Sequence, residues 1–470
     1  MRGPKAKPFL WVVLALAVPA LVGLPAGASA DGPLEVRDGA LRDERGREVV
    51  LRGVNVVVGR APWIPAGGGS EARSFDSADA GRVRAMGLNA IRLGITWEGV
   101  MPAPDAVSEA YLDRVARTVR TARRAGLHVV VAMHQKRFSS RFGGHGAPAW
   151  AVRDGGRSFD GPLPFPFEGT EAPVGRAFTA LWVDEDGLRG RYAQAWRAVA
   201  ARLTGQARVV GYDLIEAPGC DVNAAPCGQP PGPQAAGRWL APFYAALVPA
   251  VRAADDTHPV LYQDWATSAF GFPAQLGQAP NPPWALPGNV RAYGVACGTP
   301  LRSAPCRTQR AEAIRRARRA ARDDGGTSLI ARFGERGDVA DDREVVELAD
   351  RYGEGWFFGA YKGYGDAGAR PLYRDRGRPF ASRVRSIAVP YPQRIAGRDA
   401  QWAFDRADGH FTLRYRPRGS AETVVALPRG AFPVGLRLRV SGALARRDGG
   451  VVHLRARDGA RTVRLTVTNR

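Results

Sequence analysis

Three consecutive stretches decide the fold of this chain: NAIRLGIT (residues 89–96), EAYLDRVARTVRTARRA (109–125) and HVVVAMH (128–134). The first and third are short apolar runs of strand length. The second has its apolar residues at the spacing of an amphipathic helix. A strand, a helix and a second strand in this order form the repeating unit of a parallel sheet covered by helices. The stretches therefore predict an α/β fold.

The same alternation continues along the chain on both sides of this unit. Strands are expected at residues 50–56, 89–96, 128–134, 209–215, 259–263, 290–295, 328–333 and 356–361, with helices at 109–125, 188–203, 235–253, 309–322 and 343–352. Eight strands separated by helical segments are typical of a (β/α)₈ TIM barrel. The alternative is a doubly wound sheet, but no glycine-rich phosphate fingerprint follows the first strand.

A second domain is expected after the barrel. Pro390-Tyr391-Pro392 marks the change, and alternating apolar runs follow at 411–415, 423–427, 436–440, 451–455 and 462–467. Such runs, separated by turn residues, predict a small C-terminal antiparallel β-sandwich. A short hairpin is expected at 34–50. We therefore divide the chain into a signal peptide (1–30), the barrel (31–386) and the β-sandwich (387–470).

The composition describes a large and strongly basic folded protein. The 470 residues are 45% hydrophobic, which excludes a disordered chain, and 67 basic against 45 acidic residues give a net charge of +22. In a cytosolic protein this excess would indicate nucleic acid as a partner.

The N-terminus argues for an exported protein instead. Arg2, Lys5 and Lys7 precede an apolar run at 9–22, and Ala28-Ser29-Ala30 offers a cleavage site, as in a secretory signal peptide. We therefore expect a secreted protein cleaved near Ala30 that binds no nucleic acid. An uncleaved membrane anchor is the alternative.

The four cysteines fit an oxidising compartment. Cys220 and Cys227 lie close in sequence, as do Cys297 and Cys306, which predicts two short-loop disulfides. The alternative is four reduced thiols. Neither pair has the spacing of a zinc knuckle or a nearby histidine, so no metal site is expected, and no cofactor motif is present.

Arginines gather in two places. One set alternates along the predicted C-terminal strands and comprises Arg437, Arg439, Arg455, Arg457 and Arg464, and the other occupies residues 302–322. Each is interpreted first as a solvated face. The alternative for each is electrostatic contact with an anionic cell wall, an acidic glycan or lipid head groups.

Motifs at the ends of the predicted strands resemble those of glycoside hydrolase family 5, in its endoglycoceramidase-like branch. They are LRGVN (51–55), NAIRL (89–93) with Trp97, MHQ (133–135), FGGHGAPAW (142–150), GYDL (211–214) and WFF (356–358). MHQ and FGGHGAPAW are specific to the branch, and the segment around Cys297 and the sandwich after 390–393 also resemble it. Active sites of barrel enzymes lie at these C-terminal strand ends.

The resemblance implies retaining glycoside hydrolysis by two carboxylates. In the family, the acid/base is the Glu of Asn-Glu-Pro after strand four, and the nucleophile is the Glu of Glu-Phe-Gly or Glu-Trp-Gly after strand seven. The matching stretches here are EAP (216–218) and RFG (332–334). The acid/base position is therefore Ala217 and the nucleophile position is Arg332, so no catalytic residue is intact.

Other positions of the implied ligand cleft also depart from the family. Lys136 stands where the branch has Asp, Gly294 and Ala296 replace a His and a Tyr, and Gly359 replaces a Trp. The residues implied to line the cleft are Arg92, Trp97, His134, Gln135, Lys136, Gly294 and Gly359. His134 is interpreted as a structural histidine or a base, and His145 is expected to be exposed.

These departures predict a secreted, catalytically inactive relative that binds a glycan or glycolipid. The first alternative is an active retaining hydrolase with relocated carboxylates such as Glu216 and Glu335. Pairing with Arg332 would hold either one ionised and make it a poor acid. The second alternative is a basic cell-envelope protein with a vestigial cleft.

Overall fold

The computed structural model describes residues 32–66, 73–163, 169–219, 233–270, 276, 288–297, 305–334, 337–364, 370–374 and 377–470, with the backbone alone at 233–238. The predicted signal peptide, Cys220, Cys227 and Glu335 lie outside the described residues.

Eight parallel strands close into a barrel in chain order. They are β4 (Arg52–Val56), β5 (Ala90–Ile95), β6 (His128–Met133), β7 (Val209–Asp213), β8 (Val260–Gln263), β9 (Val290–Gly294), β10 (Thr327–Phe333) and β11 (Trp356–Phe358). Each expected strand is present, and β11 pairs with β4 to close the ring. The TIM barrel is confirmed, and the closed ring excludes the doubly wound alternative.

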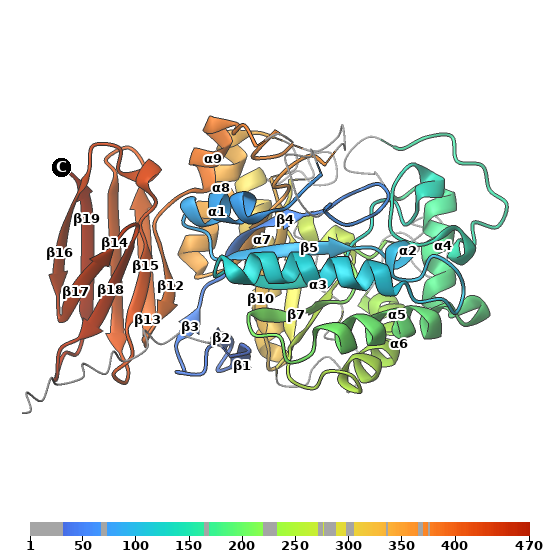
Figure 1. Cartoon of the computed structure of the whole chain (residues 1–470), viewed down its shortest axis with the longest axis horizontal. Helices are drawn as coiled ribbons and strands as arrows, with labels where there is room; N and C mark the ends of the chain where they lie inside the picture. Colours follow the sequence, from blue (N-terminus) through green and yellow to red (C-terminus); the bar gives the residue numbers. More distant parts are fainter. Residues whose placement is uncertain are drawn as a thin grey trace, which may run out of the picture.

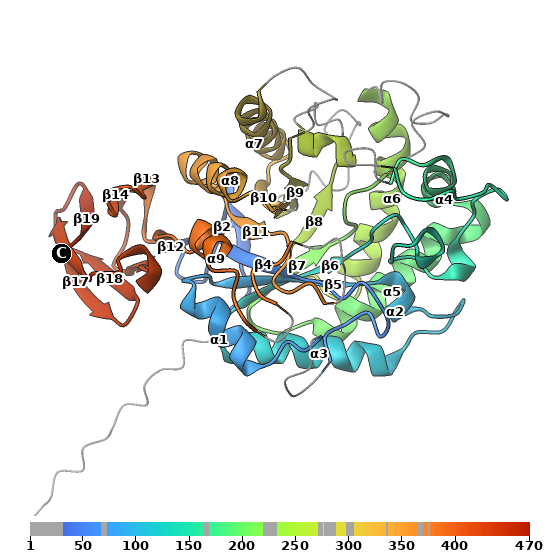
Figure 2. The same cartoon turned by 90° about the horizontal axis from the view of Figure 1, so that it is seen from above.

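Helices surround this ring on the outside (Figure 2). They are α1 (Ser77–Ala85), α2 (Trp97–Val100), α3 (Glu109–Arg124), α4 (Ala172–Trp182), α5 (Leu188–Leu203), α6 (Pro233–Arg252), α7 (Cys306–Asp323), α8 (Val339–Tyr352) and α9 (Ala381–Ile387). In the described part of the chain, no helix combines the length and the apolar character that a membrane span requires.

Helix α3 shows how the sequence sets these elements. The Ser108 side chain accepts a hydrogen bond from the Tyr111 amide and caps the N-terminus. Val115 and Val119 are buried in the stripe that faces the barrel, as the helical period requires. Every residue of the next strand, β6, is buried, because a barrel strand is covered on both faces.

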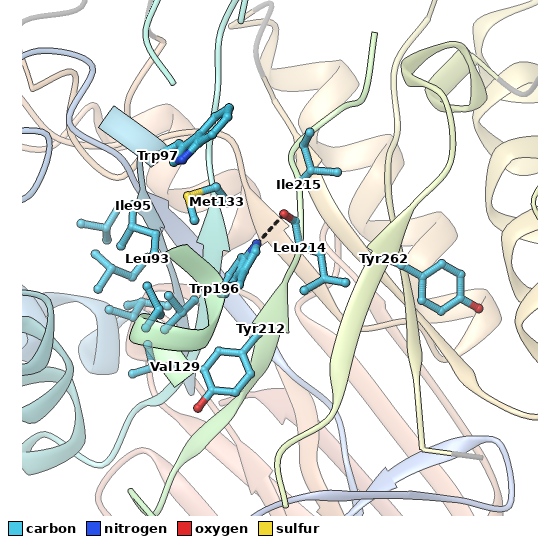
Figure 3. Packing of buried hydrophobic residues seen from close by; sticks show 14 of the residues in the cluster. Leu93, Ile95, Trp97, Val129, Met133, Trp196, Tyr212, Leu214, Ile215 and Tyr262 are labelled. Atoms are coloured by element: carbon cyan, nitrogen blue, oxygen red, sulfur yellow. Dashed lines mark hydrogen bonds between the residues drawn. The ribbon is translucent and has the colours of Figure 1, made fainter. Parts of the chain in front are cut away.

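The main hydrophobic core lies between the barrel strands and the helices. Figure 3 shows Leu93 and Val129 from two neighbouring strands beside Trp196 of α5. The Trp196 Nε1 donates a hydrogen bond to the Leu214 carbonyl at 2.9 Å, just beyond the end of β7. The polar N–H of this buried ring therefore has a hydrogen-bond partner. This packing fixes the strand end from which the site is built.

The C-terminal domain consists of two antiparallel sheets (Figure 1). One sheet has the order β1-β2-β3-β12-β15-β18-β17 and the other β13-β14-β19-β16. Their bounds are β1 (Glu35–Arg37), β2 (Ala40–Arg42), β3 (Glu48–Val49), β12 (Tyr391–Ile395), β13 (Gly397–Asp405), β14 (His410–Pro417), β15 (Thr423–Ala426), β16 (Leu436–Ser441), β17 (Ala443–Asp448), β18 (Val451–Ala456) and β19 (Val463–Asn469). The predicted antiparallel β domain is confirmed.

Two details differ from the prediction. The N-terminal hairpin joins the C-terminal domain, because Val49 of β3 pairs with Arg394 of β12, so one sheet crosses the boundary expected at residue 387.

Strands β12, β13 and β17 were not expected. Five of the six residues of β17 are exposed, so this edge strand lacks the alternation that identifies a half-buried strand.

One of the two predicted disulfides is confirmed. Cys297 is bonded to Cys306, with 5.1 Å between the Cα atoms. The bond ties the chain after β9 to the first residue of α7 and so fixes one wall of the C-terminal end of the barrel.

Candidate functional site

A buried arginine stands at the centre of the C-terminal end of the barrel. Arg92 of β5 donates from Nε and Nη2 to Oδ2 of Asp213 on β7, at 3.0 and 2.6 Å, and from Nη1 to Oδ1 of Asn55 on β4, at 3.0 Å. Its Nη2 also pairs with the Glu216 carboxylate. Arg92 is 1% exposed, so these three partners take the place of water around its charge.

A second arginine reaches the same carboxylate from the opposite side. The Nε of Arg332 on β10 lies 3.4 Å from Oε1 of Glu216, while Oε2 of Glu216 faces Arg92. The Glu216 side chain is 2% exposed and that of Arg332 is 31% exposed. Burial of Glu216 disfavours its charge, but Arg92, Arg332 and His134 outweigh it and lower its pKa. Glu216 is therefore an ionised carboxylate with both oxygens engaged.

Two glutamines hold the backbone around the family acid/base position. Gln135 donates from Nε2 to the carbonyls of Glu216 and Ala217, at 2.9 and 3.1 Å. The Ala217 amide donates to Oε1 of Gln263 at 3.0 Å. Ala217 has φ +40°, a region that a residue with a β-carbon rarely adopts. The segment is thus fixed in a strained conformation with Glu216 turned inward.

A pair of histidines lies beside this segment. Nδ1 of His134 is 2.9 Å from Nε2 of His145, and the two rings stack with their centroids 5.0 Å apart. Desolvation, the neighbouring His145 and the charges of Arg92 and Arg332 hold the pKa of His134 well below its usual value, although Glu216 opposes them. His134 is therefore neutral at pH 7. The expectation that His145 is exposed is wrong: it is 4% exposed, because FGGHGAPAW folds it against His134.

Gly294 lies beside Arg332 at the C-terminal end of the barrel. Gly294 pairs with Arg332 in the register of β9 and β10, and a β-carbon on Gly294 would lie 3.8 Å from Nη2 of Arg332. A pocket of about 490 Å³, including its open mouth, is lined by Arg332, Gly294 and Ala296 at these strand ends. The guanidinium therefore faces a pocket open to solvent, and Glu216 lies behind it.

The residues expected to line the cleft divide into two groups. His134, Gln135, Lys136, Gly294 and Gly359 are partly exposed at the C-terminal end of the barrel. Arg92 and Trp97 are each 1% exposed and are corrected to buried positions.

Trp97 opens α2 in the core (Figure 3). Its ring is edge-on to Trp150 and Tyr192, at centroid distances of 5.2 and 4.9 Å. Its ring therefore cannot stack on a ligand.

Sequence reasoning did not single out Asn55, Asp213, Gln263 and His145 as parts of the site. A polar residue inside a fully buried strand is the one available indication, and Asn55, Asp213 and Gln263 show it within β4, β7 and β8. For His145 the contact exists only because distant segments meet at one end of the barrel.

Two family descriptions match this chain. "Cellulase (glycosyl hydrolase family 5)" matches residues 43–358, and "Glycoside hydrolase family 5 C-terminal domain" matches residues 390–468.

Relatives of known name are similar over most of the chain. An endoglycoceramidase of Hydra vulgaris is 29% identical over 433 residues, 85% of this chain and 81% of that protein. Endoglycoceramidase I of Rhodococcus hoagii (strain 103S) is 27% identical over 417 residues, with 86% and 81% covered.

Solved structures are similar in fold. Endo-glycoceramidase II from Rhodococcus sp. in complex with ganglioside GM3 superimposes with a TM-score of 0.75 at 27% identity, covering 92% of this chain and 99% of that one. The lactosyl-enzyme intermediate of the same protein gives 0.74 at 26% identity, covering 92% and 100%.

Proposed function

The chain belongs to glycoside hydrolase family 5, and we propose that it is a member that binds a glycan or glycolipid without hydrolysing it. The observation that carries the proposal is the ion pair of Arg332 with Glu216, 3.4 Å apart, at the position where a family nucleophile would stand.

Retaining hydrolysis needs two carboxyl groups about 5–5.5 Å apart, one to protonate the leaving oxygen and one to attack the anomeric carbon. Ala217 has no proton to give, and the Arg332 guanidinium has no lone pair to attack with. Loss of the general acid alone typically costs about 10²–10⁴ in rate. Loss of the nucleophile removes the covalent intermediate as well.

The described carboxylates beside these positions are poor substitutes. Glu216 is held ionised by Arg92 and Arg332, which opposes an acid role, and neither of its oxygens is free to approach a sugar. Asp213 is fully buried and accepts hydrogen bonds from both Arg92 and Gln263. If Glu335 served as one catalytic carboxylate, the second carboxylate that retaining hydrolysis needs would still be missing.

Several features favour a retained binding function. The family scaffold is intact over both domains, and Gln135, His134 and Lys136 keep partly exposed positions at the strand ends. Solved relatives carry a lactosyl group or ganglioside GM3, which supports a glycolipid as the ligand class. Arg332 adds a cation at the mouth of the site, so the ligand head group is neutral or anionic.

We also propose that the protein is exported through its N-terminal segment, since residues 1–30 have the charge and apolar pattern of a signal peptide.

The proposal is tested by measuring binding and hydrolysis with the same purified chain. Ganglioside GM3 and lactosylceramide in neutral detergent micelles are the probes, with micelles lacking glycolipid as the blank. We expect saturable binding, a loss of affinity in Lys136→Ala, unchanged affinity in the exposed α3 variant Arg117→Ala, and no released oligosaccharide.

Two results would overturn it. Oligosaccharide release that Glu216→Gln abolishes would make the chain an active hydrolase with relocated carboxylates. The protein could instead be folded and bind an anionic polymer but no glycolipid. That result would favour the alternative of a basic envelope protein with a vestigial cleft.

A further inference from the structure

We propose that the outer face of the sheet β13-β14-β19-β16 docks on the anionic lipid surface of a membrane. This arginine face consists of Arg414, Arg437, Arg439 and Arg464, with Thr412, Thr466, Thr468 and Ser441 between them. It lies in the C-terminal domain, outside the barrel site.

The strand register gathers these side chains on one face. Across the sheet, Gln401 pairs with Arg414, Arg414 with Arg464, and Arg464 with Ser441. The next row places Thr412 opposite Thr466, and Thr466 opposite Arg439, while Arg437 pairs with Thr468. The four arginines are exposed, so the face presents rows of cations and hydroxyl groups to solvent.

The opposite face of the same sheet is apolar. Leu413 and Leu465, the neighbours of Arg414 and Arg464 along the chain, are each 1% exposed in the domain core. The period of two in a strand therefore fixes the arginines to the solvent side.

The arginine face lacks internal counter-charges. Arg414 and Arg464 stand directly opposite each other on neighbouring strands, an arrangement that destabilises a sheet. None of the four arginines forms an ion pair with any residue in the described part of the chain. Asp399, an acid of the same sheet, is paired with Arg416 at 3.5 Å. An external anion would therefore neutralise the charge of this face.

The other arginine-rich segment is partly neutralised. On α7, Arg310 pairs with Asp341 and Glu344 of α8, at 2.7 and 2.6 Å, and Arg318 pairs with Glu354 at 2.5 Å. Its remaining exposed arginines without an ion pair in the described part of the chain are Arg315, Arg319 and Arg322. Of the arginines expected on the sandwich, Arg455 belongs to β18 in the other sheet.

The chemistry of the face favours phosphate-bearing lipid over neutral sugar. Its rows contain no aromatic ring on which a sugar could stack, since Trp402, Phe411 and Tyr415 are buried in the core. Guanidinium groups bind phosphate in bidentate fashion, and the threonines add hydroxyl donors. Along one strand such arginines repeat at about 7 Å, and across strands at about 4.8 Å.

The position of the face favours a membrane over a soluble polyanion, because β16 and β19 lie at the end of the molecule away from the barrel (Figure 1). The choice of a membrane also rests on the proposed glycolipid ligand, which would be presented at a lipid surface.

The test measures co-sedimentation of the full mature chain with vesicles that contain no glycolipid. Phosphatidylcholine vesicles are compared with vesicles that also contain phosphatidylglycerol. The face variant Arg414→Gln/Arg464→Gln is compared with Arg117→Gln/Arg120→Gln on α3, which removes the same charge from exposed positions of the barrel. Thermal unfolding checks that each variant is folded.

We expect binding to the anionic vesicles only, weakened about 30-fold in the face variant. The α3 variant should change affinity by less than about threefold, and salt should reduce binding of every variant. Equal losses in the two variants would overturn the proposal, because net charge alone would then explain binding. Binding to soluble polyphosphate without vesicle binding would overturn it as well.

The result is independent of the glycolipid experiment. The vesicles carry no glycan, so failure of the arginine face leaves binding of GM3 in neutral micelles unaffected, and failure of the barrel site leaves vesicle binding intact.

Discussion

The Nε of Arg332 lies 3.4 Å from the Oε1 of Glu216, and the second oxygen of that carboxylate is paired with Arg92. Glu216 comes from the loop after β7, Arg332 from β10 and Arg92 from β5, so three separate strands meet at one buried carboxylate. This ion triplet holds the Glu216 carboxylate between two cations.

The two arginines should contribute unequally to stability. Arg92 is fully buried, so Arg92→Gln leaves Asp213 and Glu216 short of a cation and should destabilise the fold by about 3–5 kcal/mol. Arg332 is partly exposed and solvent screens it, so Arg332→Gln should cost about 1 kcal/mol or less. Urea unfolding of the two variants checks the order, and equal losses would contradict it.

Restoring both family carboxylates should restore some chemistry. The double variant Ala217→Glu/Arg332→Glu supplies an acid and a nucleophile at the family positions, and we expect slow but measurable hydrolysis of an aryl β-glucoside. Each single change should remain inactive, because one carboxylate cannot complete the retaining route. The matched control Ala217→Glu/Arg332→Gln lacks the nucleophile, and equal activity in this control would show that another residue attacks.

Relief of backbone strain at position 217 should stabilise the protein. Ala217 has φ +40°, which glycine adopts at little steric cost. We expect Ala217→Gly to raise the free energy of unfolding by about 0.5–1 kcal/mol, net of the greater freedom of glycine in the unfolded chain. Ala110→Gly, in the first turn of α3, should have the opposite sign. Chemical denaturation measures both, and destabilisation by Ala217→Gly would contradict the strain.

His134 should make the fold sensitive to mild acid. Its pKa is lowered in the folded state, so the unfolded chain binds the proton first and stability falls as the pH drops below about 6.5. We expect a loss of about 1 kcal/mol between pH 7 and 5, which His134→Asn should largely remove. His410→Asn, at an exposed site on β14, is the matched control. Denaturation at the two pH values measures the difference, and an unchanged pH dependence in His134→Asn would refute it.

The opposed arginines of the arginine face should cost stability in the absence of an anion. Arg464→Gln removes the repulsion with Arg414 and should raise the free energy of unfolding by about 0.2–1 kcal/mol at low salt. The gain should shrink in high salt, where exposed charges are screened. Thermal unfolding at two salt concentrations is the measurement, and a salt-independent loss of stability would argue against repulsion.

Much of the fold follows from local patterns. The eight barrel strands were predicted because runs such as 129–133 are mostly apolar, as is usual for strands buried on both faces. Strand β17 escaped prediction because it is exposed, and the pairing of β3 with β12 escaped because it joins segments more than 300 residues apart.

The candidate site was predictable only in part. The family resemblance predicts Ala217 and Arg332 at the catalytic positions, and that assignment stays a prediction. It also predicted Trp97 in the cleft, where the structure has a core residue. Burial of a large ring depends on neighbours such as Trp150 and Tyr192, which pattern reasoning does not place.

The sequence by itself determined the barrel and the following antiparallel β domain, because these depend on residue type and spacing along the chain. The tertiary structure alone decided the charge state of Glu216. Its charge state depends on the distances to Arg92 and Arg332, and those distances exist only once the barrel closes and brings β5, β7 and β10 to a common end. Coulomb interactions act through space, so residues more than a hundred positions apart fix the chemistry of this carboxylate.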